Sequence, residues 1–312
     1  MTEPAEVVLS AQNLTKRFGR REAVADVSFD VRAGEVFGFL GPNGAGKTTT
    51  IRMLVGLARP DRGTVRIRGL DIASRFEEAL SHVGCIVESP DLYRYLTGRE
   101  NLLHFARMLG PGAAERIEEL AALVMLSERL DDRVATYSLG MRQRLGIAQA
   151  LLGDPDVLIL DEPANGLDPA GIREIRHLVR SLSRERGMSV FVSSHLLSEI
   201  ELMCDRVAIV HRGRTLAAAP VADLLARVSS DRLLVRALPA AAAVEVVGRF
   251  GEVEPGSPED REALGVAARV PPERVPDLLR ALVAAGLDVH TIERPEASLE
   301  EIFLEITGSQ TV

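Results

Sequence analysis

The segment from Gly41 to Thr48, GPNGAGKT, constrains the fold more than any other part of this 312-residue chain. It fits the pattern G-x-x-x-x-G-K-[ST], follows an apolar run at Val36–Leu40 and opens a helix-like pattern at Thr48–Leu57. A strand, a glycine-rich turn and a helix in this order gather backbone N–H groups and the positive helix end around one point. They predict a phosphate-binding loop, in which Lys47 reaches the β- and γ-phosphates and Thr48 ligates Mg²⁺. An incidental lysine in a glycine-rich turn is the alternative, and it is disfavoured because the chain has only two lysines.

A second apolar run, Val157–Leu160, ends in two acidic residues, Asp161 and Glu162. In a parallel sheet such a strand delivers the next residue to the carboxyl edge, where ligands of these sheets bind. Asp161 would hold Mg²⁺ there through a water, and Glu162 would act as general base on a water that attacks the γ-phosphate. Taken alone, the pattern fits a strand with an acidic turn equally well. Its position after a phosphate loop favours the catalytic interpretation.

Strand-like and helix-like patterns alternate up to about residue 215. Val24–Val31 and Val207–Val210 are further strand candidates, whereas Glu100–Leu130 has apolar positions at helical spacing. Strands that alternate with helices predict a layered α/β domain with a mostly parallel sheet. For residues 1–215 we therefore predict an α/β domain that also contains antiparallel strands, interrupted by a helical subdomain at about residues 89–153.

Residues 216–312 have the pattern of a small α+β accessory domain. Strand and helix patterns follow in the order strand, helix, weak strand, strand, helix, strand, which fits a ferredoxin-like unit. A stretch rich in proline, glycine and acidic residues, Glu254–Asp260, lies within it. Ser298 and Glu301 have the spacing of a capping box that opens a final helix through Ile306.

The composition excludes several classes of protein. With 46% hydrophobic and 26% charged residues the chain is an ordinary globular one, and its apolar runs are far shorter than the ~18 residues of a membrane helix. The first ten residues lack the features of a secretory signal, which predicts a cytoplasmic protein. A net charge of −8 argues against a nucleic-acid partner. Two cysteines, Cys85 and Cys204, offer no disulfide framework and are expected in the core.

With the two phosphate motifs in place, the chain resembles the ATP-binding cassette (ABC) ATPases. Residues 137–145, YSLGMRQRL, resemble the signature of that family: Ser138 and Gly140 stand at the expected positions, and Leu139 and Met141 replace a glycine and a glutamine. A serine that caps a helix would present, with the free N–H groups, a site for a γ-phosphate. The resemblance implies that this phosphate belongs to ATP held by the other half of a dimer. A simple helix cap is the alternative.

Three further segments resemble motifs of the same family. Asn165–Asp168 resembles its D-loop, with Asp168 expected at the dimer seam. His195 resembles the histidine that senses the γ-phosphate, and a structural histidine is the alternative. Phe18 stands where the family places an aromatic that stacks on adenine, and an ordinary core phenylalanine is the alternative.

One residue departs from the family pattern, because Glu88 aligns with a position that is normally glutamine. A carboxylate accepts from water or reaches Mg²⁺, but it cannot donate as an amide does. This glutamate and the SLGM signature resemble the subgroup that serves antibiotic, bacteriocin and lantibiotic export or self-protection, such as bacitracin export. Residues 298–308 also resemble drug-export ATPases, whereas the resemblance to the family as a whole covers about residues 7–215.

The resemblance implies an ATPase at the cytoplasmic face of the membrane, which works as an ATP-dependent homodimer and powers export of a drug, antibiotic, peptide or lipid through a separate permease. The permease is expected to dock near Glu88–Glu100 on the apolar side chains of Leu92, Tyr93, Tyr95 and Leu96; packing of these side chains within the helical subdomain is an equal alternative. A soluble ABC ATPase that acts on ribosomes or nucleic acid is the alternative function, and ATP-driven import is a third. The implied site comprises catalytic Lys47, Glu162 and His195; nucleotide contacts at Phe18, Gly41, Pro42, Asn43, Gly44, Ala45, Gly46, Lys47, Thr48, Thr49, Ser138, Gly140 and Asp168; and Mg²⁺ ligands Thr48, Glu88 and Asp161.

Overall fold

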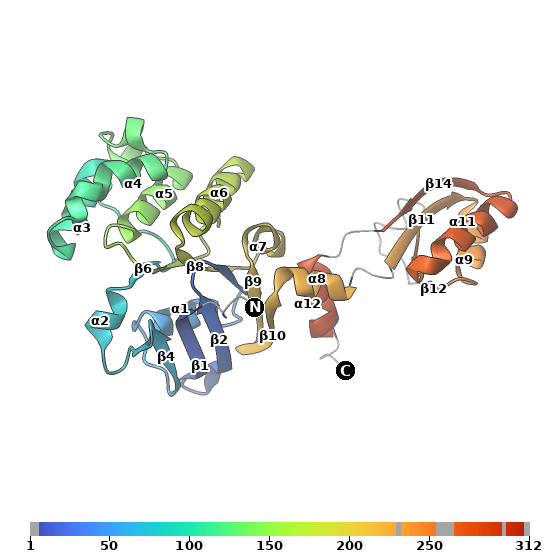
Figure 1. Ribbon diagram of the computed structural model, residues 1–312, viewed down its shortest axis with the longest axis horizontal. Helices are drawn as coiled ribbons and strands as arrows, with labels where there is room; N and C mark the ends of the chain where they lie inside the picture. Colours follow the sequence, from blue (N-terminus) through green and yellow to red (C-terminus); the bar gives the residue numbers. More distant parts are fainter. Residues whose placement is uncertain (1–5, 229–231, 254–264, 295–297, 309–312) are drawn as a thin grey trace. The chain divides into compact units, whose positions relative to one another are not determined.

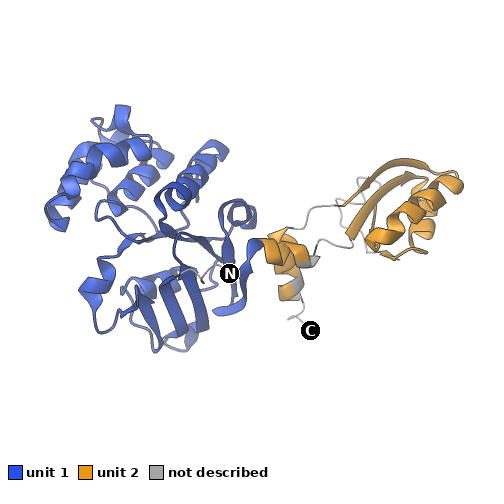
Figure 2. Cartoon of the chain, viewed as in Figure 1, with its two compact units in different colours: residues 1–221 blue, residues 222–312 orange. Residues whose placement is uncertain are grey.

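The structure is a computed structural model that describes residues 6–228, 232–253, 265–294 and 298–308. It divides into two compact units, residues 1–221 and 222–312 (Figure 2). Among the described residues, none of the helices combines the length and apolar character that a bilayer crossing requires. The stretch Glu254–Asp260 lies outside the described residues.

The first unit is built on a six-stranded sheet in the order β10-β9-β3-β8-β7-β6. Neighbouring strands from β9 to β6 run parallel, and β10 pairs antiparallel with β9. All five residues of β3 and all five of β7 are buried, as expected of strands covered on both faces. The strands of this sheet are β3 (Val36–Leu40), β6 (Val83–Ile86), β7 (Val157–Asp161), β8 (Ser189–Ser194), β9 (Arg206–His211) and β10 (Arg214–Pro220).

A second sheet of the first unit is antiparallel, in the order β2-β1-β4-β5. Its strands are β1 (Val7–Phe18), β2 (Arg21–Arg32), β4 (Arg62–Ile67) and β5 (Leu70–Asp71). β2 is longer than the predicted strand Val24–Val31, and it pairs with β1 through register shifts that interrupt the apolar alternation without ending the ladder. Four phenylalanine rings, with centroids 5.3–5.9 Å apart in the contacting pairs, join this sheet to the central one: Phe29, Phe37, Phe39 and Phe191.

Helices cover the central sheet and connect its strands (Figure 1). The phosphate-loop helix α1 (Lys47–Leu54) contributes Ile51 and Leu54 to the core shared by the two sheets. On the other face, α7 approaches β3 so closely that a Cβ at Gly38 would lie 2.8 Å from the side chain of Ile200. The remaining helices outside the helical insertion are α2 (Phe76–Leu80), α6 (Pro169–Arg186) and α7 (Leu197–Met203).

A group of helices lies between β6 and β7, where the sequence predicted an insertion; Figure 1 shows them together in green. The stretch Glu100–Leu130 is mostly helical, as the sequence predicted, and it is broken after α3 (Gly98–Leu109). Gly110 and Gly112, on either side of a proline, have φ of 102° and 94°, which ends the helix. The elements are α3 (Gly98–Leu109), α4 (Ile117–Leu123), α5 (Leu139–Ala150) and the 3₁₀ turns Ala113–Arg116, Ser127–Arg129 and Val134–Thr136.

The second unit contains a four-stranded antiparallel sheet in the order β12-β13-β11-β14, with α9 and α11 packed against it. With strands and helices alternating as β11-α9-β12-β13-α11-β14, these elements follow a βαββαβ course. Ser298 and Glu301 exchange the two reciprocal hydrogen bonds of a capping box, which confirms that prediction. The elements are α8 (Val221–Val228), β11 (Arg232–Leu238), α9 (Ala240–Val247), β12 (Glu252–Val253), β13 (Gly265–Arg269), α11 (Val275–Ala284), β14 (Asp288–Glu293) and α12 (Leu299–Gly308).

Two details differ from the sequence expectations. The first unit ends after Val221 rather than residue 215, because β10 completes the central sheet by pairing with β9. Cys204 is buried, and burial raises the pKa of its thiol, but the expectation of a core position is wrong for Cys85. Cys85 is exposed and lies on β6, the edge strand of the central sheet.

Candidate functional site

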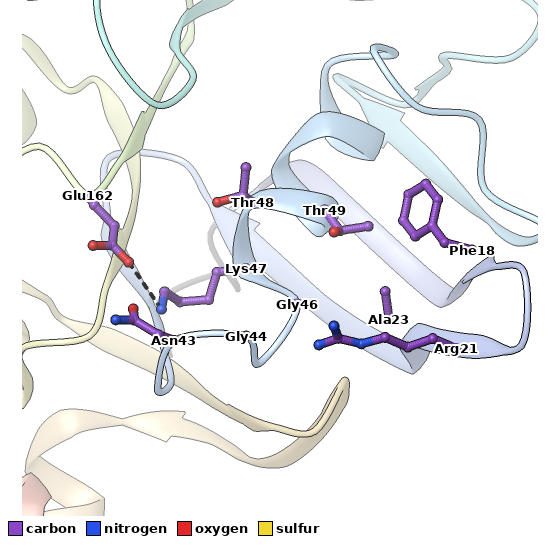
Figure 3. Close-up of a pocket in the computed structure, with 10 residues that line it drawn as sticks. All are labelled: Phe18, Arg21, Ala23, Asn43, Gly44, Gly46, Lys47, Thr48, Thr49 and Glu162. Atoms are coloured by element: carbon purple, nitrogen blue, oxygen red, sulfur yellow. Dashed lines mark ion pairs between the residues drawn. The ribbon is translucent and has the colours of Figure 1, made fainter.

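A pocket of about 320 Å³ lies where β3 runs into the glycine-rich loop (Figure 3). The loop and the start of α1 form one wall, the hairpin of β1 and β2 forms another, and Glu162 closes one end. This is the carboxyl edge of the parallel strands, where the sequence placed the site. The lining residues are Phe18, Arg21, Ala23, Asn43, Gly44, Gly46, Lys47, Thr48, Thr49 and Glu162.

The loop keeps its shape because glycine is required at two positions. Gly46 has φ of 103°, and a Cβ there would lie 2.5 Å from the carbonyl oxygen of Ala23. A Cβ at Gly41 would lie 2.3 Å from the carbonyl oxygen of Val210. The loop can therefore pass this close to β2 and β9 only without side chains at these points. Ala45 is buried and its N–H donates to the carbonyl of Pro42, so this part of the loop is structural.

The N-terminus of α1 offers the pocket an uncompensated positive end. The helix begins at Lys47, its capping residue Gly46 supplies no side-chain cap, and its first turn has no acidic residue. The first N–H groups of a helix have no intrahelical acceptor, and the macrodipole adds about half a positive charge there. Thr48 and Thr49 belong to this turn and line the pocket. The arrangement is suited to an anionic group such as phosphate.

Lys47 is held at the inner end of the pocket by backbone oxygens. Its ammonium group donates to the carbonyls of Gly41 at 2.7 Å and Pro42 at 3.3 Å, and it lies 3.1 Å from Oε1 of Glu162. The side chain is only 4% exposed, so its charge acts in a low-dielectric environment where Coulomb interactions are strong. The structure thus brings two of the predicted catalytic residues together (Figure 3).

Glu162 also contacts the third predicted catalytic residue. Its Oε2 lies 2.7 Å from Nδ1 of His195, which follows directly after β8. Glu162 has φ of 48°, an uncommon conformation for a residue other than glycine, which turns the chain sharply at the end of β7. One carboxylate therefore stands between an ammonium group and an imidazole.

Asp161 is not among the residues that line the pocket, and its carboxylate is held by a serine that the sequence analysis missed. The Asp161 carboxylate is 3% exposed and accepts a 2.5 Å hydrogen bond from the hydroxyl of Ser193. The same hydroxyl accepts from the backbone N–H of Glu162 at 3.0 Å. Ser193 thus links the two acidic residues across β7 and β8. The sequence analysis singled out His195, two residues later, but no spacing pattern marked Ser193 as a functional residue.

The residues present fit a magnesium ion that shares its coordination with a phosphate ligand. Among the described residues, no group of three or more His, Cys, Asp or Glu side chains could enclose a metal. Mg²⁺ needs no such group, since it usually takes one or two protein ligands together with waters and substrate phosphates. Asp161 and the hydroxyl of Thr48 are ligands of the right kind. Glu88 is not among the residues that line the pocket, and its carboxylate pairs with Arg52 at 2.5 Å.

At the outer end of the pocket the ring of Phe18 is 56% exposed, so the alternative of a core phenylalanine does not hold. The ammonium group of Lys16 lies 5.8 Å from its centroid, a cation–π distance. Arg21 and Ala23 also line this end, and the sequence analysis missed both.

Ser138 caps the helix α5, as the sequence predicted, because its hydroxyl accepts a hydrogen bond from the N–H of Met141 at 3.2 Å.

Ser138, Gly140 and Asp168 lie together in a second pocket of about 430 Å³, which shares no lining residue with the first. Asp168 caps α6 through the N–H of Gly171 at 2.8 Å. The predicted site residues therefore form two groups. The phosphate loop, Glu162 and His195 form one group, and the signature and D-loop residues form the other.

Residues 24–165 match the family described as ABC transporter. An ABC transporter ATP-binding protein, YhcH of Bacillus subtilis (strain 168), is 48% identical over 303 residues, 97% of each chain. The bacitracin transport ATP-binding protein BcrA of Bacillus licheniformis is 39% identical over 305 residues, 98% of this chain and 99% of that one. A solved structure of the ATP-binding subunit of an ABC transporter is similar with a TM-score of 0.63 and 33% identity, over 70% of this chain and 92% of that one.

Proposed function

This chain belongs to the ABC transporter family of ATP-binding proteins and is an ATPase of that family, and on this premise we propose that it powers export of a drug or peptide antibiotic through a separate membrane permease. Support for the exported class comes from BcrA, a bacitracin transport protein to which the chain is similar along nearly its whole length. In this proposal the unit of residues 1–221 is the nucleotide-binding domain and the unit of residues 222–312 is an accessory domain.

The observation that carries the proposed chemistry is the position of Glu162 between Lys47 and His195. We assign Glu162 as the general base, because its carboxylate can accept a proton from a water that attacks the γ-phosphate. Lys47 and the N–H groups of α1 stabilise negative charge that develops on the phosphoryl oxygens. His195 orients the carboxylate and hydrogen-bonds the γ-phosphate.

Adenine is assigned to the exposed ring of Phe18 at the opposite end of the pocket. Mg²⁺ would be held by Thr48 and Asp161, and when bound it neutralises charge on the phosphates. Ser193 keeps the Asp161 carboxylate and the Glu162 backbone in fixed positions.

The separation of the two pockets supports a homodimer with shared sites. Ser138 caps α5, and at Gly140 a Cβ would make only ordinary van der Waals contacts, the nearest atom being 3.8 Å away. We assign this pocket to the γ-phosphate of ATP that is bound in the phosphate loop of a second copy. Each closed dimer then holds two ATP molecules, one at each seam, and ATP stabilises the closed form because it contacts both protomers.

The docking site for the permease is assigned to an aromatic surface formed by Tyr93 and Tyr95 before α3. The two side chains are 39% and 70% exposed, and the ring of Tyr93 also contacts His104 and Phe105 of α3. The backbone below is rigid, because Asn101 hydrogen-bonds both the N–H and the carbonyl of Tyr93. Exposed aromatic side chains on a fixed backbone favour partner binding over packing within the helical insertion.

The test is deletion of the gene from the native host, followed by a survey of resistance to peptide antibiotics and drugs. Wild-type protein should restore resistance to the exported compound, and Glu162→Gln should not. The protein should sediment with membranes at their cytoplasmic face and co-purify with a permease. Tyr95→Ala should weaken that co-purification, whereas Leu304→Ala, at a side chain that is 67% exposed in the second unit, should not. Sedimentation with ribosomes in place of membranes would favour the alternative function on ribosomes or nucleic acid.

A further inference from the structure

The hairpin that carries Phe18 also carries an arginine that faces the same pocket. Phe18 and Arg21 are directly opposite each other in the antiparallel pairing of β1 with β2. Side chains of directly paired residues project from the same face of a ribbon. Both residues line the pocket, and Figure 3 shows the Arg21 side chain extending beneath the loop toward Gly44 and Gly46. Its Nη2 lies 3.8 Å from the point that a Cβ of Gly44 would occupy.

Arg21 carries a charge that no carboxylate of the described chain neutralises. No hydrogen bond or ion pair joins its side chain to the residues that the structure describes, whereas the side chain of Arg17 in the same hairpin pairs with Glu22 at 2.5 Å. Within the pocket the only carboxylate is Glu162, and it is paired with Lys47 at the far end. The guanidinium group is therefore available to an anionic ligand.

We propose that Arg21 binds the phosphate chain of the nucleotide on the side of the loop opposite Lys47. This inference rests on the proposed nucleotide site. A guanidinium group presents parallel N–H donors that match two phosphate oxygens, and charge-assisted bonds of this kind are roughly twice as strong as neutral ones. Because the Arg21 side chain extends toward Gly44 and Gly46 and lies away from Glu162, it contacts phosphates that ADP and ATP both carry (Figure 3).

The test is the equilibrium dissociation constant of ATP and of ADP, measured by calorimetry on the full chain. Arg21→Gln should raise the dissociation constants of both nucleotides by about tenfold, equal to 1.4 kcal/mol. Arg21→Lys should raise them less, because lysine keeps the positive charge but lacks the parallel N–H donors of the guanidinium group. Arg20→Gln is the matched control, since its exposed side chain is adjacent in the hairpin and does not line the pocket. Arg21 is exposed, so the thermal midpoint without nucleotide should be the same in all variants.

The outcomes separate this inference from the proposed function. Equal dissociation constants for Arg21→Gln and Arg20→Gln, with wild type binding normally, would overturn the role of Arg21 and leave the nucleotide site intact. A loss confined to ATP would also overturn it, because the guanidinium group would then contact the γ-phosphate. Wild-type protein that binds neither nucleotide would overturn the proposed function itself.

Discussion

At the scale of single residues, the carboxylate of Glu162 contacts both the ammonium group of Lys47 and the imidazole of His195. Each of these three residues was singled out in the sequence by a motif. Ser193 and Arg21 escaped detection for a physical reason. A serine in a buried strand and an arginine at a hairpin have no characteristic spacing, and their roles depend on contacts between strands that are distant in the sequence.

Glu162→Gln should abolish most ATP turnover while ATP still binds. The amide keeps the size of the side chain but cannot take a proton from water, and general-base catalysis typically contributes 10²–10⁴-fold. Removing the charge beside Lys47 should leave ATP affinity equal or higher, since the ammonium group then faces the phosphates without a competing carboxylate. Phosphate release and nucleotide binding measured on the same preparation check both points. Turnover at the wild-type rate would remove Glu162 from the role of base.

Ser193→Ala should lower kcat more than it raises KM for ATP. The substitution removes the hydroxyl that donates to buried Asp161 and accepts from the N–H of Glu162. Loss of a partner of a buried charged group costs about 1–3 kcal/mol, which should also appear as a lower free energy of unfolding. Ser194→Ala is the control, because its hydroxyl bonds only within the turn at Leu196. Equal kinetics in the two variants would show that Ser193 positions neither acid.

At the scale of elements, prediction succeeded where one local pattern decides the structure. The run β3, loop and α1 was predicted because Val36–Leu40 is buried on both faces and the glycines fix the turn. The helical character of the stretch after Glu100 was predicted, whereas its break at Gly110 and Gly112 was not, although both glycines are in the sequence. The long pairing of β1 and β2 was missed because its register shifts depend on the partner strand.

The loop that follows β6 is joined to α1 by an ion pair. Glu88 has φ of 67° and its carboxylate contacts Arg52 of α1, so it links the loop that leads to the helical insertion with the phosphate-loop helix. We expect Glu88→Gln to retain ATPase activity, because the side chain does not line the pocket. We also expect Glu88→Gln to alter the coupling of hydrolysis to transport. Arg52→Gln should alter this coupling to the same extent, because it removes the same ion pair. Both side chains are about half exposed, at 47% and 60%, so loss of the pair should cost under about 1 kcal/mol of stability.

ATPase activity in detergent and transport in vesicles should be measured for both variants, with Arg59→Gln as control. Arg59 is on the same segment but forms no ion pair among the residues that the structure describes. Complete loss of ATPase activity in Glu88→Gln would contradict this expectation and indicate that Glu88 takes a direct part in hydrolysis. A difference in coupling between Glu88→Gln and Arg52→Gln would show that the ion pair does not determine the coupling of hydrolysis to transport.

At the scale of the whole molecule, the site residues form two pockets that share no lining residue. Sequence spacing could not predict this separation, because the signature lies between the two phosphate motifs along the chain. The family resemblance implied it through a second copy. A site completed within one chain and a site completed between two chains make opposite predictions for mixtures of defective variants.

Mixing Lys47→Ala with Gly140→Asp should restore ATPase activity that neither variant has alone. Lys47→Ala removes the ammonium group that we assign to the phosphates. Gly140→Asp places a negative charge where the γ-phosphate is expected without a clash, since the nearest atom to a Cβ there is 3.8 Å away. In a mixed dimer one seam carries both defects and the other carries none. With random pairing and independent seams, activity should reach about a quarter of the wild-type value. Co-refolded or co-expressed mixtures, assayed beside each variant alone, provide the measurement. No recovery at any mixing ratio would mean that each chain must complete its own site.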